Sequence, residues 1–130
     1  MALSVAVDAN IILPSLAGGA AAQVLFDPRY EFLTTEFTFQ EVIHYLPRFS
    51  EKTSLAEPLL EQTLLLLPIK RLSRNSYRHS LAQARHLIGK RDPKDVDLLA
   101  LALAFHCPLL SHDRDFEGLP IQLVKIKDLI

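Results

Sequence analysis

Residues 91–116 read RDPKDVDLLALALAFHCPLLSHDRDF, and this stretch decides the fold. Its Asp-Pro pair is a helix-start signal, because aspartate is a preferred N-cap and proline fits the first helical position. The small and apolar residues that follow predict a helix to about His106. Cys107 to Leu110 then predict a short buried strand, and Asp113 and Asp115 follow that strand. The stretch is therefore a helix, an apolar strand and an acidic loop.

The same alternation extends over the rest of the chain. We expect further strands at Leu3–Val7, Tyr30–Thr34, 66–69 and 121–124, and helices at 19–26, 36–46, 54–65 and 75–88. The helix from Glu36 should end before Pro47, and the one from Asn75 should end at Gly89. Short apolar strands alternating with helices indicate a parallel sheet covered on both faces. The predicted fold class is α/β, a three-layer α/β/α sandwich of about five strands in an order such as 3-2-1-4-5.

Composition sets limits on the class of protein. The 130 residues fit a single domain over 1–130, and 49% hydrophobic with 22% charged residues is typical of a globular chain. The apolar runs are too short or too interrupted to span a membrane, and we expect no leader before the first strand. Cys107 is the only cysteine, so we expect a buried thiol and no internal disulfide. A cytoplasmic location is the expectation.

Acidic residues stand where the apolar segments begin or end. In an open parallel sheet, ligands bind beyond the carboxyl ends of the strands at the point where the strand order reverses. The first and fourth strands flank that point, which would bring Asp8 close to Ser111 and Asp113. Glu41 lies on an apolar helix, and Asp95 lies in the first turn of another. Carboxylates gathered in one pocket repel each other unless a cation joins them, and Mg²⁺ or Mn²⁺ prefers such oxygen ligands.

Each acid also has a structural explanation. Asp8 could cap a turn, and acids are common in loops such as the one that carries Asp113. Glu41 stands three residues after Thr38, which fits the capping-box pattern at a helix start. Asp95 would complement a helix dipole, and Asp97 on the same helix could be the inward acid instead. We favour Asp95, because it shares its face with apolar residues of the helix.

A basic segment runs directly into these acids. No Asp or Glu occurs from Lys70 to Arg91, although the net charge of the chain is −1. Six of its basic residues are candidate contacts for a polyanion: Arg71, Arg74, Arg78, Arg85, Lys90 and Arg91. The alternative is that they form only the solvated face of a helix.

The ordered set of segments resembles the PIN-domain family, small metal-dependent ribonucleases that include the VapC-type toxins. The resemblance rests on VDANIIL at the start, the mid-chain helix with its glutamate, and residues 91–116. It implies four catalytic acids, which are Asp8, Glu41, Asp95 and Asp113. It further implies that Mg²⁺ or Mn²⁺ is held by Asp8, Asp95, Asp113 and Asp115, with Asn10 and Ser111 in support. Ser111 stands where the family usually has threonine, and His112 departs from the usual small or amide residue.

The resemblance also implies a reaction and partners. The reaction is hydrolysis of an RNA phosphodiester, with the basic segment contacting the RNA backbone. An antitoxin protein and a homodimer are the implied partners, and apolar contacts with them could use Phe37, Tyr45 and Phe49. Two alternatives stay open. One is a PIN-like interaction module without activity, and the other is a phosphoacceptor signalling domain, which usually has two adjacent acids after the first strand, where this chain has only Asp8.

Overall fold

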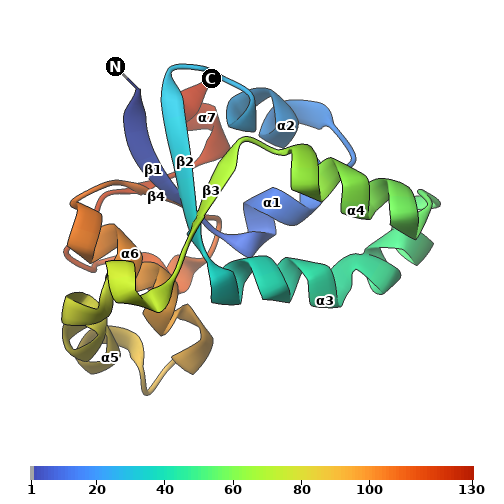
Figure 1. Ribbon diagram of the computed structural model, residues 1–130. Coiled ribbons are helices and arrows are strands. Elements are labelled where there is room, and N and C mark those ends of the chain that lie inside the picture. Colours follow the sequence, from blue (N-terminus) through green and yellow to red (C-terminus); the bar gives the residue numbers. More distant parts are fainter. Residues whose placement is uncertain (1) are drawn as a thin grey trace.

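A five-stranded parallel sheet forms the centre of the computed structural model, which describes residues 2–130 (Figure 1). The strand order is β3-β2-β1-β4-β5, as predicted. The strands are β1 (Leu3–Val7), β2 (Tyr30–Thr35), β3 (Ile69–Leu72), β4 (Leu109–Leu110) and β5 (Leu123–Val124). On one side of β1, Ala6 pairs with Leu33, and on the other side Val7 pairs with Leu110. The carboxyl ends of β1 and β4 therefore lie next to each other.

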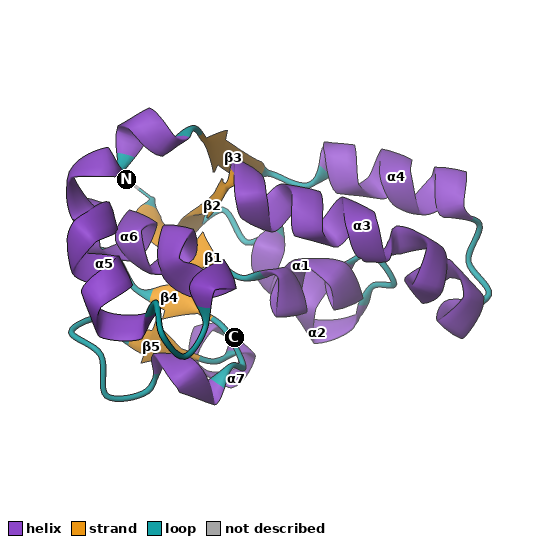
Figure 2. Ribbon diagram, turned by 90° about the horizontal axis from the view of Figure 1, so that it is seen from below, coloured by secondary structure: helices purple, strands orange, loops and turns teal. Residues whose placement is uncertain are grey.

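Helices cover both faces of the sheet, which confirms the three-layer prediction. They are α1 (Ala9–Ser15), α2 (Gly19–Leu25), α3 (Glu36–Thr53), α4 (Glu57–Leu66), α5 (Leu81–Ile88), α6 (Val96–Phe105) and α7 (Ile126–Leu129). Side chains alternate along β1, so Val5 and Val7 pack with α1 to α4 and α7, whereas Ala6 packs with α5 and α6. Figure 2 shows the two groups of helices on opposite sides of the strands.

Helix α6 is the most buried helix of the fold. Every residue from Val96 to Ala102 is buried, including Asp97, because the helix lies between the sheet and α5. It ends at His106, whose φ of 50° is left-handed, and the chain then turns directly into β4 through the buried Cys107. The predicted burial of the thiol is confirmed. This packing fixes the residue that precedes α6, which is Asp95.

Several element boundaries differ from the predictions. Residues 9–15 form a helix that we had not predicted, because its apolar turn is short and contains Pro14. Helix α3 continues through Pro47 to Thr53, since a proline removes one backbone hydrogen bond and the buried Leu46 beside it still holds the helix on the core. Strand β3 begins at Ile69 rather than Leu66, because α4 extends to that leucine.

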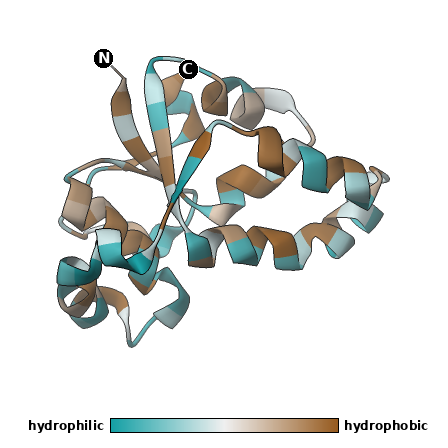
Figure 3. Ribbon diagram, in the orientation of Figure 1, coloured by the Kyte–Doolittle hydropathy of each residue, from teal (hydrophilic) through white to brown (hydrophobic). Residues whose placement is uncertain are grey.

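The predicted helix at 75–88 is also divided. Two short 3₁₀ turns, at Arg74–Ser76 and Arg78–Ser80, precede α5. A third 3₁₀ turn, at Pro93–Asp95, opens the helix predicted from residue 92. Along β3 the hydropathy changes from Ile69 to hydrophilic Lys70 and Arg71 (Figure 3), so this edge strand begins the basic segment. Among the described residues, no helix has the length and apolarity needed to cross a membrane.

Candidate metal centre

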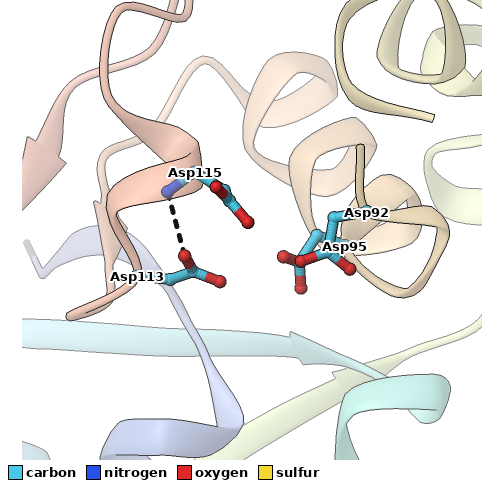
Figure 4. A group of neighbouring side chains, drawn as sticks. All are labelled: Asp92, Asp95, Asp113 and Asp115. Atoms are coloured by element: carbon cyan, nitrogen blue, oxygen red, sulfur yellow. Dashed lines mark hydrogen bonds between the residues drawn. The ribbon is translucent and has the colours of Figure 1, made fainter. Parts of the chain in front are cut away.

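Four aspartates from two segments face one another at the carboxyl end of the sheet (Figure 4). Asp92 precedes the 3₁₀ turn before α6 and Asp95 ends it, and Asp113 and Asp115 come from the loop after β4. One carboxylate oxygen of each lies within 4.8 Å of the corresponding oxygens of the other three. Asp113 also accepts a hydrogen bond from the backbone N–H of Asp115, at 2.9 Å. The geometry is that of an oxygen-ligand site for a divalent cation.

Asp95 is a buried acid of this cluster whose pKa is raised far above its ordinary value. Its side chain is buried, and among the described residues its Oδ2 is the buried side-chain atom that has no hydrogen-bond partner. Burial, the adjacent Asp92 carboxyl and the charges of Asp8 and Asp113 together raise its pKa to about 9. A buried carboxylate with no donor and several acidic neighbours is stable only as the acid or beside a cation. A hard divalent metal would satisfy that oxygen, so these residues fit the implied metal.

Asp8 borders the cluster and is held in a fixed orientation. One carboxylate oxygen accepts the N–H of Ala9 at 2.7 Å, which caps α1, and the other accepts the Ser111 hydroxyl at 2.7 Å. Burial raises the pKa of Asp8, and the charges of Asp113 and Asp92 raise it further. Asp8 therefore both caps α1 and lies beside the other acids.

Ser111 connects the two central strand ends. Its buried hydroxyl, besides donating to Asp8, accepts from the backbone N–H of Asp113 at 3.0 Å and from Nδ2 of Asn10 at 3.3 Å. Asn10 in turn accepts the N–H of His112 at 3.3 Å through its Oδ1. The predicted supporting residues thus tie the loop after β1 to the loop after β4.

Glu41 is half-buried on α3 and belongs to the same charged group. Burial raises its pKa, as do the charges of Asp8 and Asp92, while Lys94 lowers it. The capping-box explanation for Glu41 is wrong, because α3 begins earlier. Its N-cap is Thr35, whose hydroxyl accepts the N–H of Thr38 at 2.9 Å, which leaves Glu41 free to face the cluster.

Asp92 is the acid that sequence reasoning missed. We had interpreted it as a helix N-cap, but its side chain makes no capping hydrogen bond and points into the cluster. The available signal was the pair of acids three residues apart, at 92 and 95, which lie on one face of a helical turn.

Asp97 faces away from the cluster. It accepts two hydrogen bonds from Arg74, at 3.0 and 3.1 Å, and one from the Tyr77 hydroxyl at 2.6 Å. Burial and this carboxylate raise the pKa of Tyr77, so the phenol stays a donor. The structure therefore places Asp95, and not Asp97, among the grouped acids.

The six predicted basic residues have different surroundings in the structure. Arg91 donates to the backbone carbonyl of Asp115 at 2.9 Å, which places it beside the cluster. Arg71 lies over the Phe39 ring at 4.2 Å from its centroid. Arg74 is paired with Asp97. The other three are exposed: Arg78, Arg85 and Lys90.

Comparison with known families decides where this arrangement belongs. A sequence model of the PIN domain matches residues 6–128. The chain belongs to the PIN-domain family. The acids and all of the sheet except the start of β1 lie inside the matched residues, so the PIN domain accounts for nearly the whole chain.

Solved structures agree with this PIN fold. VapBC2 from Rickettsia felis, bound to a DNA fragment from its promoter, has a TM-score of 0.72 at 11% identity, covering 95% of this chain and 98% of that one. DNA-bound VapBC from Salmonella typhimurium has 0.72 at 16%, covering 95% and 98%. A toxin–antitoxin complex from Klebsiella pneumoniae has 0.67 at 20%, covering 92% and 96%. At these identities the likeness establishes the fold alone. Comparison with curated proteins gave no match.

Proposed function

We propose that this PIN domain, over residues 1–130, is a metal-dependent endoribonuclease that hydrolyses RNA phosphodiester bonds. One observation carries the proposal. Four carboxylates from two separate segments converge within 4.8 Å, and the most buried of them has an oxygen without a hydrogen-bond donor. A fold retains such mutual repulsion where a functional cation offsets it.

The metal that fits this centre is Mg²⁺ or Mn²⁺, because every candidate ligand atom is a carboxylate oxygen. Asp95, Asp113 and Asp115 would hold it together with Asp92, and Asp8 would complete the site from the end of β1. Bound there, the metal would lower the pKa of a water molecule and offset charge on the phosphate.

The protein side chains have distinct tasks in this reaction. Glu41 is suited to accept a proton from the attacking water, because burial and the neighbouring acids raise its pKa toward the working range of a general base. Ser111 orients Asp8 by donating to its carboxylate. The exposed basic side chains from Arg71 to Arg91 would bind the RNA backbone without choosing a sequence.

The signalling alternative has little support in this geometry. A phosphoacceptor domain usually has two adjacent acids after its first strand, but here Ala9 and Asn10 follow Asp8. Membership in the PIN-domain family supports the nuclease instead. The interaction module without activity remains the alternative that the experiment below separates.

We further propose that the protein is the toxin of a toxin–antitoxin pair and forms a homodimer. Support comes from the similar structures, one of which is described as a toxin–antitoxin complex. A groove of about 160 Å³ between α3 and α4, lined by Phe39, Ile43 and Leu65 among others, offers an apolar surface for a protein partner. Leu65 and Leu66 are 69% and 77% exposed beside it. Co-purification with a candidate antitoxin, and the mass in solution, test these two partners.

The activity is tested by incubating the purified protein with structured RNA in Mn²⁺ or in EDTA. We expect cleavage only with the metal, and none by Asp8→Asn or Asp113→Asn. Glu51→Gln, on the exposed far end of α3, is the control that should keep activity. Cleavage that survives EDTA or both substitutions contradicts the mechanism. Failure to cleave a broad RNA panel, with no metal binding by calorimetry, would favour the interaction module.

A further inference from the structure

A second hollow adjoins the acids on the side of α3. Its volume is about 490 Å³, within the range of small-ligand sites. Its lining comes from the first turns of α3, the turn before α6, the first turn of α6 and the 3₁₀ turn after β3: Phe37, Gln40, Glu41, Arg74, Lys94 and Asp97. Glu41 lines this hollow and has its pKa raised by the nearby charges of Asp8 and Asp92, and Pro93 and Lys94 directly follow Asp92 in the chain, so the hollow lies beside the candidate metal centre.

Phe37 is unusual in this hollow because it is a large aromatic side chain that the fold does not bury. It is 58% exposed, one helical turn before Glu41. The face of α3 that packs on the core is formed by other residues, namely Phe39, Val42 and Leu46. Phe37 therefore contributes little to the core, and its replacement should leave the fold intact.

The ring is nevertheless held by a fixed partner. The Arg74 guanidinium lies 5.2 Å from the Phe37 centroid. Two hydrogen bonds to Asp97 fix that guanidinium, and Tyr77 fixes the carboxylate in turn. A rigid aromatic surface of this kind loses little side-chain entropy when a flat ligand stacks on it.

We propose that Phe37 stacks a nucleobase of single-stranded RNA next to the phosphate that is cleaved. The inference rests on the proposed ribonuclease function. Aromatic rings bind bases of any identity, and cations beside the ring strengthen such contacts. Arg74, paired with Asp97, holds the ring in place, and the exposed Lys94 offers a cation to a phosphate, so the hollow combines a stacking face with one free positive charge.

This arrangement assigns two tasks to two neighbouring places. The acids act on the phosphate, and Phe37 holds the adjoining base so that the strand enters in one register. Because a paired base is already stacked within a duplex, the substrate class that fits is an unpaired segment such as a loop or an end.

The test is cleavage of a single-stranded RNA of defined length in Mn²⁺. Phe37→Ala should lower kcat/KM by roughly 5- to 150-fold, the measured range for losing one base–aromatic stack. Phe37→Trp should restore most of the rate, because it keeps the stacking face. Phe26→Ala is the matched control, since Phe26 is 57% exposed at the end of α2, away from the acids, and should be unaffected.

Abasic substrates make the test specific to stacking. An abasic nucleotide beside the cleavage site should slow the wild type by the same factor and should slow Phe37→Ala no further. If the wild type cleaves and the Phe37→Ala rate is unchanged, the stacking inference fails while the nuclease stands. An effect of Phe37→Ala confined to oligomeric state or to binding of a protein also overturns it, in favour of a protein contact. A wild type that cleaves no RNA overturns the proposed function itself.

Discussion

Asp95→Asn should stabilise the metal-free protein at neutral pH, although it removes a residue of the candidate site. Its carboxyl has a pKa of about 9 in the folded state and an ordinary value when the chain is unfolded. The folded state therefore binds one more proton than the unfolded state between these two pKa values. Stability consequently falls as pH rises through that window. An asparagine cannot ionise, so it escapes this cost.

The size of the effect follows from the same difference. The carboxyl has a pKa of about 3.9 in the unfolded chain. At about pH 7.5, keeping it protonated in the folded state therefore costs about 5 kcal/mol, at 1.36 kcal/mol for each pH unit. Water and local movement relieve part of such costs, so we expect Asp95→Asn to gain about 2 kcal/mol or more. At about pH 4.5 the cost of protonating this carboxyl is less than about 1 kcal/mol, so Asp95→Asn should gain correspondingly little stability there.

Urea unfolding followed by circular dichroism measures both values in EDTA. Asp97→Asn is the matched control two residues away, where the carboxylate accepts three hydrogen bonds, and it should lose stability instead. Adding Mn²⁺ should stabilise the wild type and affect Asp95→Asn much less. A loss of stability by Asp95→Asn in EDTA at neutral pH, or an equal gain at both pH values, would refute the reasoning.

Three further results follow from the site. Ser111→Ala should lower kcat/KM by roughly 10- to 100-fold, because the Asp8 carboxylate loses its orienting donor, and it should also lower stability, because the buried hydroxyl makes three hydrogen bonds. Ser111→Thr keeps the hydroxyl and should retain activity, and equal rates for both variants would contradict this. In EDTA the melting temperature of the wild type should fall as pH rises from acidic to neutral, since burial raises the pKa of Asp8 and Glu41, and a flat profile by scanning calorimetry would argue against it. Arg78→Ala and Arg85→Ala should each reduce the salt dependence of RNA binding by about 0.7 in the log–log slope, measured by fluorescence anisotropy; an unchanged slope would remove these side chains from the RNA surface.

The sequence predicted the sheet because its signals are local and strong. Apolar strands alternating with helices leave few topologies, and the acids after the first and fourth strands then had to meet. The predicted ends of helices and strands were less accurate where the local sequence is compatible with either ending or continuing the element. Pro47 looked like a helix end, yet packing of Leu46 carried the helix onward.

The candidate site was predicted incompletely for a related reason. Asp92 before proline has a sufficient local explanation as a helix cap, and only the tertiary position of the loop after β4 shows that it faces other acids. From sequence, Phe37 is likewise compatible with a place in the core or in a contact with a protein partner, because the sequence does not show on which side of α3 the core lies. Such features depend on what a distant segment brings near.

The burial of α6 has a consequence for how this protein can change over generations. A helix that is packed on all sides from Val96 to Ala102 has no free face on which substitutions are neutral. A change of side-chain volume there would shift the turn that carries Asp95, because a closely packed helix has no room to adjust. The exposed basic side chains after β3 carry no such constraint. We therefore expect residues 96–102 to change little over generations, while the exposed basic residues are replaced more freely.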